Sequence, residues 1–295
     1  MRTPLTTASG TFGYGTEYAA ALDYSCLGAV TVKGIRMSPW PGNGMPRHAE
    51  VPGGLVNAIG LQGPGIDDFL AYHLPHYVDV VGSDLPMIVN IWGGSIDEYA
   101  AVAARLSDAG APVAAIEVNV SCPNVKAGGH TFGHDPAVLA QVVKAVRAAT
   151  ALPLIVKLAP NVPDIVPYVR ACEDGGADAI ALINTIPAMV IDIERRRPVL
   201  ANRTGGLSGR AVHPVAVKLV HDAYRATTLP ILGMGGVYEA ADAIELMLAG
   251  ATAIAVGTAT FTDPATAERV LGGIVEYCTR HGFSSACELT GALDG

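Results

Sequence analysis

Eight short runs of small and β-branched residues recur along this chain of 295 residues, and this repetition constrains the fold more than any other feature. Runs of this length and composition predict strands, at residues 4–7, 29–33, 87–91, 114–120, 154–158, 179–183, 231–233 and 253–256. Each run is followed by a stretch with helical periodicity, as in 95–109, 135–149 and 237–249. Eight such units in a chain of this length favour an α/β fold of the (β/α)8 or TIM-barrel type. A doubly wound sheet, which usually has fewer strands, is the weaker alternative.

The length of the chain and the lack of a linker-like segment predict one domain, residues 1–295. Within it we expect long excursions after strands 2, 4 and 6. Two of these excursions span residues 34–64 and 186–212. Long connections in a compact domain usually form lids, binding loops or partner surfaces. On a barrel they rise from the carboxyl ends of the strands, where active sites are built.

Charge and cysteine content narrow the class of protein. The formal net charge is −8, which argues against a nucleic-acid surface, and the basic run 195–197 is interpreted as a solvated hairpin. The five cysteines are odd in number and lack CxxC spacing, so they indicate neither a disulfide framework nor a cysteine-bound metal. No apolar stretch has the length of a signal-peptide core or a membrane span. We therefore expect a cytoplasmic protein with no membrane or nucleic-acid partner.

The ends of the predicted strands are rich in amides, lysines and glycines. They carry Lys33, Asn90, Asn119, Lys157, Asn184 with Thr185, Gly235 with Gly236, and Gly257 with Thr258. A barrel glycosidase needs two carboxyl groups beside the scissile bond, and a metal hydrolase needs clustered His and Asp. Neither pattern occurs at these positions. His130 and His134 lie in a glycine-flanked loop without a third ligand, so we expect solvated side chains and no metal site.

The last two predicted strands end in glycine, in ILGMGGV and AVGTATF. Glycine turns at strands seven and eight of a barrel favour a phosphate held by backbone N–H groups. Lysines at the mouth need a partner charge, and Glu117 is a candidate inward counter-ion because it shares the strand face of Asn119. A phosphate cradle with cations and amides suits FMN, since a lysine near its pyrimidine edge would stabilise the reduced ring.

Cys122 lies in NVSCPNVKAGG, just beyond the fourth predicted strand. A lone cysteine is usually buried and inert. Beside a flavin, its thiolate could remove a proton from the carbon next to the one that gives up hydride. Two other classes stay open: a phosphosugar lyase or aldolase with Lys157 as Schiff-base amine, and a non-catalytic FMN-binding scaffold.

An ordered series of motifs resembles the class 1 dihydroorotate dehydrogenases. The motifs are ASGTFGYGTEY, PRHAEVPGGLVNAIGLQGPG, VNVSCPNVKAGGHTFG, IVKLAPN, INT, GGLSG, GMGG and VGTA, over about residues 7–261. SCPNVKAGG is most similar to the class 1B branch. The resemblance implies FMN-dependent oxidation of dihydroorotate to orotate in de novo pyrimidine synthesis. It also implies a homodimer of catalytic subunits and a separate subunit that carries FAD and a [2Fe–2S] cluster and passes electrons to NAD+.

The resemblance also implies roles for individual residues. Cys122 would be the general base that takes the C5 proton while C6 gives hydride to flavin N5. The implied FMN contacts are Ser9, Lys33, Gly34, Asn90, Asn119, Lys157, Ile183, Gly209, Gly235, Gly236, Gly257 and Thr258. The implied substrate contacts are Lys33, Asn57, Ala58, Ile59, Gly60, Leu61, Asn119, Asn124, Asn184 and Thr185.

Four positions depart from the usual family pattern: Ile35, Gly63, Pro187 and Ala188. Pro187 and Ala188 lie directly beyond the implied substrate contacts Asn184 and Thr185, so another dihydropyrimidine stays open as the substrate. A tRNA dihydrouridine synthase would also use a cysteine, but the acidic charge argues against an RNA substrate.

Overall fold

A computed structural model describes residues 1–120, 126–127, 130–131 and 133–293. Its largest sheet has eight strands, joined by parallel pairs in the order β1-β16-β15-β10-β9-β6-β5-β2. The strands are β1 Leu5–Thr7, β2 Val30–Ile35, β5 Met87–Ile91, β6 Val113–Asn119, β9 Leu154–Lys157, β10 Ala179–Leu182, β15 Ile231–Met234 and β16 Ala253–Val256. Each coincides with a predicted run to within two residues. The predicted α/β barrel is confirmed.

Side chains complete the barrel where the strand order ends, between β1 and β2. The Thr7 hydroxyl donates to the carbonyl of Thr31 at 3.0 Å and accepts from the Thr31 N–H at 2.9 Å. The hydroxyl oxygens of Thr6 and Thr31 lie 3.0 Å apart. All three threonines are buried, so their polar groups are satisfied across the seam.

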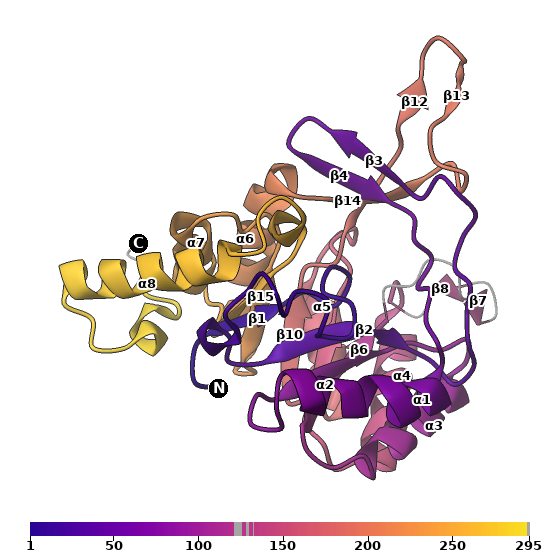
Figure 1. The fold of residues 1–295 in the computed structure, drawn as a ribbon, viewed down its shortest axis with the longest axis horizontal. Helices are drawn as coiled ribbons and strands as arrows, with labels where there is room; N and C mark the ends of the chain where they lie inside the picture. The colour runs from indigo at the N-terminus through magenta and orange to yellow at the C-terminus, as the bar shows by residue number, and fades with distance from the viewer. Residues whose placement is uncertain (121–125, 128–129, 132, 294–295) are drawn as a thin grey trace.

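Helices surround the barrel (Figure 1). They are α1 Ile66–Asp68 with the π-helical turn η2 Phe69–His73, α2 Leu74–Val80, α3 Ile96–Ser107, α4 Pro136–Ala149, α5 Val166–Gly175, α6 His213–Tyr224, α7 Ala240–Leu248 and α8 Thr266–His281. Short 3-10 helices are η1 Tyr24–Cys26, η3 Arg210–Val212, η4 Thr258–Phe261 and η5 Ala286–Leu289.

The prediction of a regular helix after every strand is wrong for the first unit, where only η1 forms between β1 and β2. Gly13 and Gly15 there have φ values of 54° and 95°, and the Tyr24 hydroxyl donates to the Gly15 carbonyl at 2.9 Å. Phe12 stacks on Tyr18 with ring centroids 4.8 Å apart. These contacts of Tyr18 and Tyr24 hold the segment between β1 and β2 in a non-helical conformation. A helix this short would gain little from its own hydrogen bonds.

The alternation of side chains divides each strand between two environments. Outward residues such as Val30, Val89 and Val156 join the main core under the helices. Inward residues near the amino ends of the strands are small or apolar, and include Ala29, Ile88 and Ala115. The next inward positions toward the carboxyl ends are polar, which places the polar residues of the site at the barrel mouth.

The excursions after the second and sixth barrel strands meet in a second sheet, of order β11-β14-β4-β3. Its strands are β3 His48–Val51, β4 Gly54–Asn57, β11 Ile186–Ala188 and β14 Gly205–Ser208. The hairpin of β12 Ile191–Asp192 and β13 Arg197–Pro198 stands away from the barrel (Figure 1), and it contains the exposed residues 195–197 as predicted. After the fourth barrel strand, β7 Lys126–Ala127 pairs with β8 His130–Thr131. Within the described ranges, no helix is long and apolar enough to cross a membrane.

Candidate active site

A polar layer crosses the inside of the barrel at β5, β6 and β9. Asn90 donates from Nδ2 to Glu117 Oε1 at 2.6 Å, and Lys157 Nζ lies 3.5 Å from the same oxygen. The Glu117 side chain has no exposed surface and that of Lys157 is 7% exposed. The predicted pairing of Glu117 with a lysine of the mouth is therefore confirmed, and the partner is Lys157.

Two buried polar atoms near this layer lack a hydrogen-bond partner within the described residues: Glu117 Oε2 and Trp92 Nε1. Buried polar atoms of this kind are usually satisfied by a partner or by water. Trp92 follows β5, and a Cβ placed on Gly34 would lie 3.1 Å from its ring and 2.8 Å from Asn90 Oδ1. Glu117 Oε2 is thus an acceptor and Trp92 Nε1 a donor that a bound molecule or a water can satisfy. Gly34 packs so closely on Asn90 and Trp92 that a side chain there would collide with them.

Amides continue the layer toward the excursion after β10. Asn184 donates from Nδ2 to Asn119 Oδ1 at 3.3 Å, and its own Oδ1 accepts from the Thr185 N–H at 2.8 Å. The buried Tyr99 of α3 supports this group from behind, because its hydroxyl donates to the Asn119 carbonyl at 2.7 Å. These contacts bring Asn119, Asn184 and Thr185 together at one side of the mouth, as expected.

The segment that carries Asn57 reaches the same side. Asn57 ends β4 and donates from Nδ2 to the carbonyl of Gly206 at 3.3 Å. A Cβ on Gly206 would lie 1.9 Å from Thr185 Oγ1, so Thr185 packs directly over this glycine. Asn57 is therefore connected to Asn184 through Gly206 and Thr185. Pro187 and Ala188, the departures from the family pattern, form β11 beside β14.

The opposite end of the mouth is built from backbone. Gly235 and Gly236 follow β15 with φ values of 130° and 72°, and Gly209 has a φ of 101°. A Cβ on Gly236 would lie 3.0 Å from the Gly209 carbonyl oxygen. Thr258, which follows β16 and Gly257, donates to Ser208 Oγ at 2.8 Å. The glycines and the Thr258 hydroxyl that were predicted to contact FMN thus lie together at one place, beside Ser208, which was not predicted.

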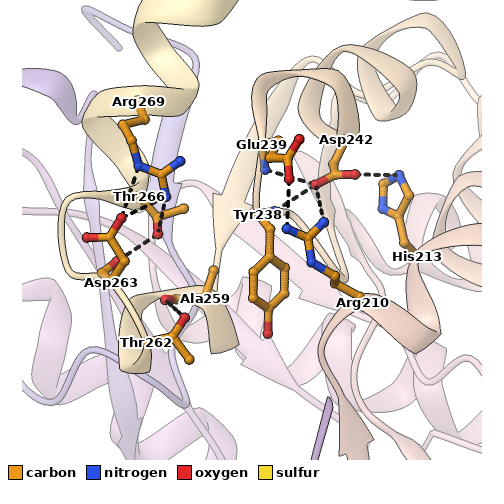
Figure 2. Close-up of polar contacts among 10 residues, drawn as sticks. All are labelled: Arg210, His213, Tyr238, Glu239, Asp242, Ala259, Thr262, Asp263, Thr266 and Arg269. Atoms are coloured by element: carbon orange, nitrogen blue, oxygen red, sulfur yellow. Dashed lines mark hydrogen bonds and ion pairs between the residues drawn. The ribbon is translucent and has the colours of Figure 1, made fainter. Parts of the chain in front are cut away.

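A network of polar side chains lies next to this glycine turn, and Figure 2 shows its members Arg210, His213, Tyr238, Glu239 and Asp242. His213 Nδ1 lies 2.8 Å from the Gly235 carbonyl oxygen, and its Nε2 lies 3.1 Å from Glu245 Oε2 and 4.0 Å from Asp242 Oδ1. Arg210 packs on the Tyr238 ring at 4.4 Å and donates to Glu239 at 2.8 Å. This network surrounds the turn from η3, α6 and α7, and sequence patterns did not predict it.

Lys33 faces a cavity of about 750 Å³ between the loop after β1 and the excursion after β2. Burial, and then the nearby Arg47 guanidinium, lower the pKa of Lys33, while Glu17 acts in the opposite direction. A bound anion would favour the charged form of this lysine. Arg47 donates to Pro41 and Asn43 carbonyls and to the Gln62 side chain, which folds the excursion around the cavity.

The remaining predicted residues divide into two groups. Ser9 lies beside the polar layer, with Oγ 3.4 Å from Lys157 Nζ. Ile183 packs against the glycine turn, because a Cβ added to Gly235 would lie only 3.3 Å from the Ile183 side chain. Cys122 and Asn124 lie outside the described residues.

Sequence reasoning missed the supporting residues Tyr99 and His213, and a cluster around Arg36, Trp40 and Trp92. The position of both tryptophans near strand or loop ends was the available signal.

The donor set suits FMN chemically: glycine backbone and hydroxyls at one end, and a lysine, amides and a buried carboxylate at the other. It suits a Schiff-base enzyme less well, because the Lys157 amine lies in an ion pair with the buried Glu117 carboxylate, 3.5 Å from its Oε1. No group of three potential metal ligands occurs among the residues that the structure describes.

Comparison with known proteins identifies the family. A family model described as dihydroorotate dehydrogenase matches residues 1–277. The chain belongs to the dihydroorotate dehydrogenase family. A relative from Citrifermentans bemidjiense, named dihydroorotate dehydrogenase B (NAD(+)), catalytic subunit, is 52% identical over 100% of this chain and 95% of that protein. Proteins of the same name from Trichlorobacter lovleyi and Geobacter sulfurreducens are 52% and 49% identical, over 100% of this chain and 96% and 95% of theirs. The predicted resemblance to class 1B is confirmed.

A solved member of the dihydroorotate dehydrogenase family has the same fold. The structure of DHODH in complex with ferulenol from Eimeria tenella superimposes with a TM-score of 0.81, at 22% identity, over 98% of this chain and 85% of that chain. The overall fold is therefore shared at low sequence identity.

Proposed function

We propose that the protein is the FMN-binding catalytic subunit of a dihydroorotate dehydrogenase and oxidises dihydroorotate to orotate in pyrimidine synthesis. The similarity to relatives with this name, at 49–52% identity over nearly their whole length, supports the activity. One observation supports it independently of names. The glycine turns of β15 and β16 and the amide-lysine layer of β5, β6 and β9 face the same barrel mouth.

The two ends of this mouth support the assignment of FMN as the cofactor. Gly209, Gly235, Gly236, Gly257 and Thr258 would hold the phosphate. The flavin ring would lie toward Ser9, Lys33, Gly34, Asn90, Asn119, Lys157 and Ile183. Lys157 would stabilise negative charge at the ring, and Glu117 holds that lysine in position. When bound, FMN supplies the acceptor for the hydride that leaves C6 of dihydroorotate.

The chain's own residues would bind the substrate and move one proton. The amides of Asn57, Asn119, Asn124 and Asn184, with Thr185, would orient the pyrimidine ring, and the backbone of residues 58–61 would contact it. Lys33 would bind the substrate carboxylate, an anion that would offset the cost of burying this lysine. Cys122 would take the proton from C5 as the C6 hydride leaves, so one double bond forms and two electrons leave the substrate.

Partners complete the proposal. A separate subunit carrying FAD and a [2Fe–2S] cluster would accept the electrons, and two catalytic subunits would pair through one self-complementary surface. The dimer is tested by light scattering on the FMN-loaded protein, where a monomer at micromolar concentration would reject it. The whole chain, residues 1–295, would act as one FMN-binding domain.

The test is anaerobic mixing of the yellow protein with dihydroorotate while flavin absorbance is followed. We expect rapid bleaching in the parent and a rate lower by about 10²- to 10⁴-fold in Cys122→Ala, because the base is lost. Cys287→Ala is the matched control, since this cysteine is exposed on η5. A parent that binds FMN but stays oxidised with dihydroorotate would remove dihydroorotate as the substrate and leave the FMN assignment standing. Equal bleaching rates in Cys122→Ala and the parent would remove Cys122 as the base.

A further inference from the structure

The chain's two tryptophans enclose one arginine at the edge of the barrel mouth. Arg36 follows β2 and Trp92 follows β5. The Arg36 guanidinium carbon lies 4.7 Å from the Trp92 ring centroid and 5.2 Å from that of Trp40. The two rings meet edge to face with centroids 6.1 Å apart. Arg36 is therefore held on two sides by aromatic rings, which attract its charge.

Glu98 fixes the orientation of the same guanidinium. Arg36 donates from Nε to Glu98 Oε1 at 2.8 Å and from Nη2 to Oε2 at 3.0 Å. Glu98 also accepts from the Gly94 N–H at 2.7 Å, and its own N–H donates to the cap residue Ser95 at 3.2 Å. A bidentate ion pair of this kind fixes the orientation of the guanidinium plane as well as neutralising its charge. The arginine is thereby fixed to the start of α3.

Trp40 connects this cluster to residues 57–61. Its Nε1–H donates to the Gly60 carbonyl at 2.9 Å. Its backbone N–H and carbonyl exchange hydrogen bonds with Gly63, both at 2.9 Å. Asn43 donates to the carbonyls of the two residues before Gly60. Its Nδ2 donates to the Ala58 carbonyl at 3.0 Å, and its backbone N–H donates to the Ile59 carbonyl at 3.0 Å. Three successive carbonyls of the segment are thus held by residues 40–43.

The segment itself needs this support. Gly60 and Leu61 adopt φ values of 80° and 57°, in the left-handed region. A residue with a side chain, such as Leu61, holds that conformation only where its surroundings impose it. The other end of the segment, at Asn57, is fixed by pairing of β4 with β14. The Trp40 side is the second attachment.

We propose that Arg36 is a positioning residue for substrate binding, which acts through Trp40 on the backbone of residues 58–61. This inference rests on the proposed function, in which that segment binds the pyrimidine. Arg36 contacts Trp40, Trp92 and Glu98, and these three residues are not among those assigned to FMN. Loosening Arg36 changes the shape of the substrate site and leaves the proposed proton acceptor, Cys122, and the proposed hydride acceptor, FMN, in place. The effect therefore falls on KM more than on kcat.

The experiment compares two variants with a matched control. Arg36→Lys keeps the charge and removes the planar fork, and Trp40→Phe keeps an aromatic ring and removes the donor to Gly60. Arg105→Lys is the control, because Arg105 makes an exposed ion pair with Asp67 at 2.7 Å. Amide hydrogen exchange of the peptide 57–64 is measured on the FMN-loaded proteins, together with FMN affinity and steady-state kinetics. Tryptophan emission is recorded for Arg36→Lys, since the only two tryptophans are both in this cluster.

We expect faster exchange of peptide 57–64 in both variants, changed emission in Arg36→Lys, and unchanged exchange in Arg105→Lys. KM for dihydroorotate should rise about three- to tenfold, the effect of one lost hydrogen bond, with kcat within about twofold and FMN affinity unchanged. Exchange of peptide 57–64 at the parent rate in both variants overturns the inference. A rise in KM that is accompanied by an equal fold-loss of FMN affinity overturns it as well. If the parent protein does not oxidise dihydroorotate, the proposed function is rejected instead. The exchange data still decide whether Arg36 positions residues 58–61.

Discussion

The two ends of the barrel mouth are built by different means. At the carboxyl ends of β15 and β16, backbone makes the site, and Gly235 and Gly236 leave no space for a side chain. At β2 and β5, side chains make the site, with Arg36 between two tryptophans and paired with Glu98. A backbone turn that contacts its neighbours closely tolerates no added atom. A side-chain cluster can lose one contact and keep the others, so substitutions at the two ends should have effects of different size.

The largest expected effect is at the backbone end. In Gly236→Ala, the new Cβ would lie 2.7 Å from His213 Cβ, at a φ of +72°. We expect FMN affinity to fall by about tenfold to a hundredfold, because strain of about 1–3 kcal/mol displaces the turn. The measurement is FMN fluorescence quenching on titration of the FMN-free protein.

Gly110→Ala separates strain from site geometry. Gly110 has nearly the same φ, +69°, but nothing lies within 4 Å of an added Cβ, and it precedes β6 at the other end of the barrel. We expect the free energy of unfolding of Gly110→Ala to fall by about 1–2 kcal/mol, with FMN affinity unchanged. Equal FMN affinities for the two variants would show that the turn at Gly236 does not hold the cofactor.

The same contrast explains what the sequence could predict. GMGG and VGTA are local patterns, and each places its glycines at a strand end without knowledge of distant residues. The pairing of Glu117 with a lysine also followed from strand alternation. The Arg36 cluster did not, because Arg36 and Glu98 are 62 residues apart and meet only when β2 and β5 pair. The missing first helix has a similar cause, since contacts of Tyr18 and Tyr24 replace the helix there.

A middle-sized effect is expected at the polar layer between the two ends. Glu117→Gln removes a buried negative charge 3.5 Å from Lys157 and keeps an acceptor for Asn90. The uncompensated lysine should favour the reduced, anionic flavin, so the FMN midpoint potential should rise. We expect a shift on the order of 30 mV, equal to about 1.4 kcal/mol for a two-electron couple.

Spectroelectrochemistry of the FMN-loaded protein measures this potential. Glu276→Gln removes the same charge from the exposed face of α8 and serves as the control. A parent-like potential in Glu117→Gln would mean that Lys157 does not act on the flavin ring, and would weaken the assignment of this end of the mouth.

The smallest expected effect is a pH dependence at the side-chain end. Burial acts to raise the pKa of Glu98, but hydrogen bonds from Arg36 and the Gly94 N–H and the charge of Arg36 outweigh it, so the net pKa is below the usual 4.5. A carboxylate with a lowered pKa stabilises the fold above its unfolded pKa and loses this contribution as pH falls through the folded value. The parent should therefore be more stable than Glu98→Gln by about 1 kcal/mol or less near pH 7. That difference should shrink below pH 4.5. Urea unfolding of both proteins across this range measures it, and a difference that is constant with pH would mean that the charge of Glu98 does not stabilise the cluster.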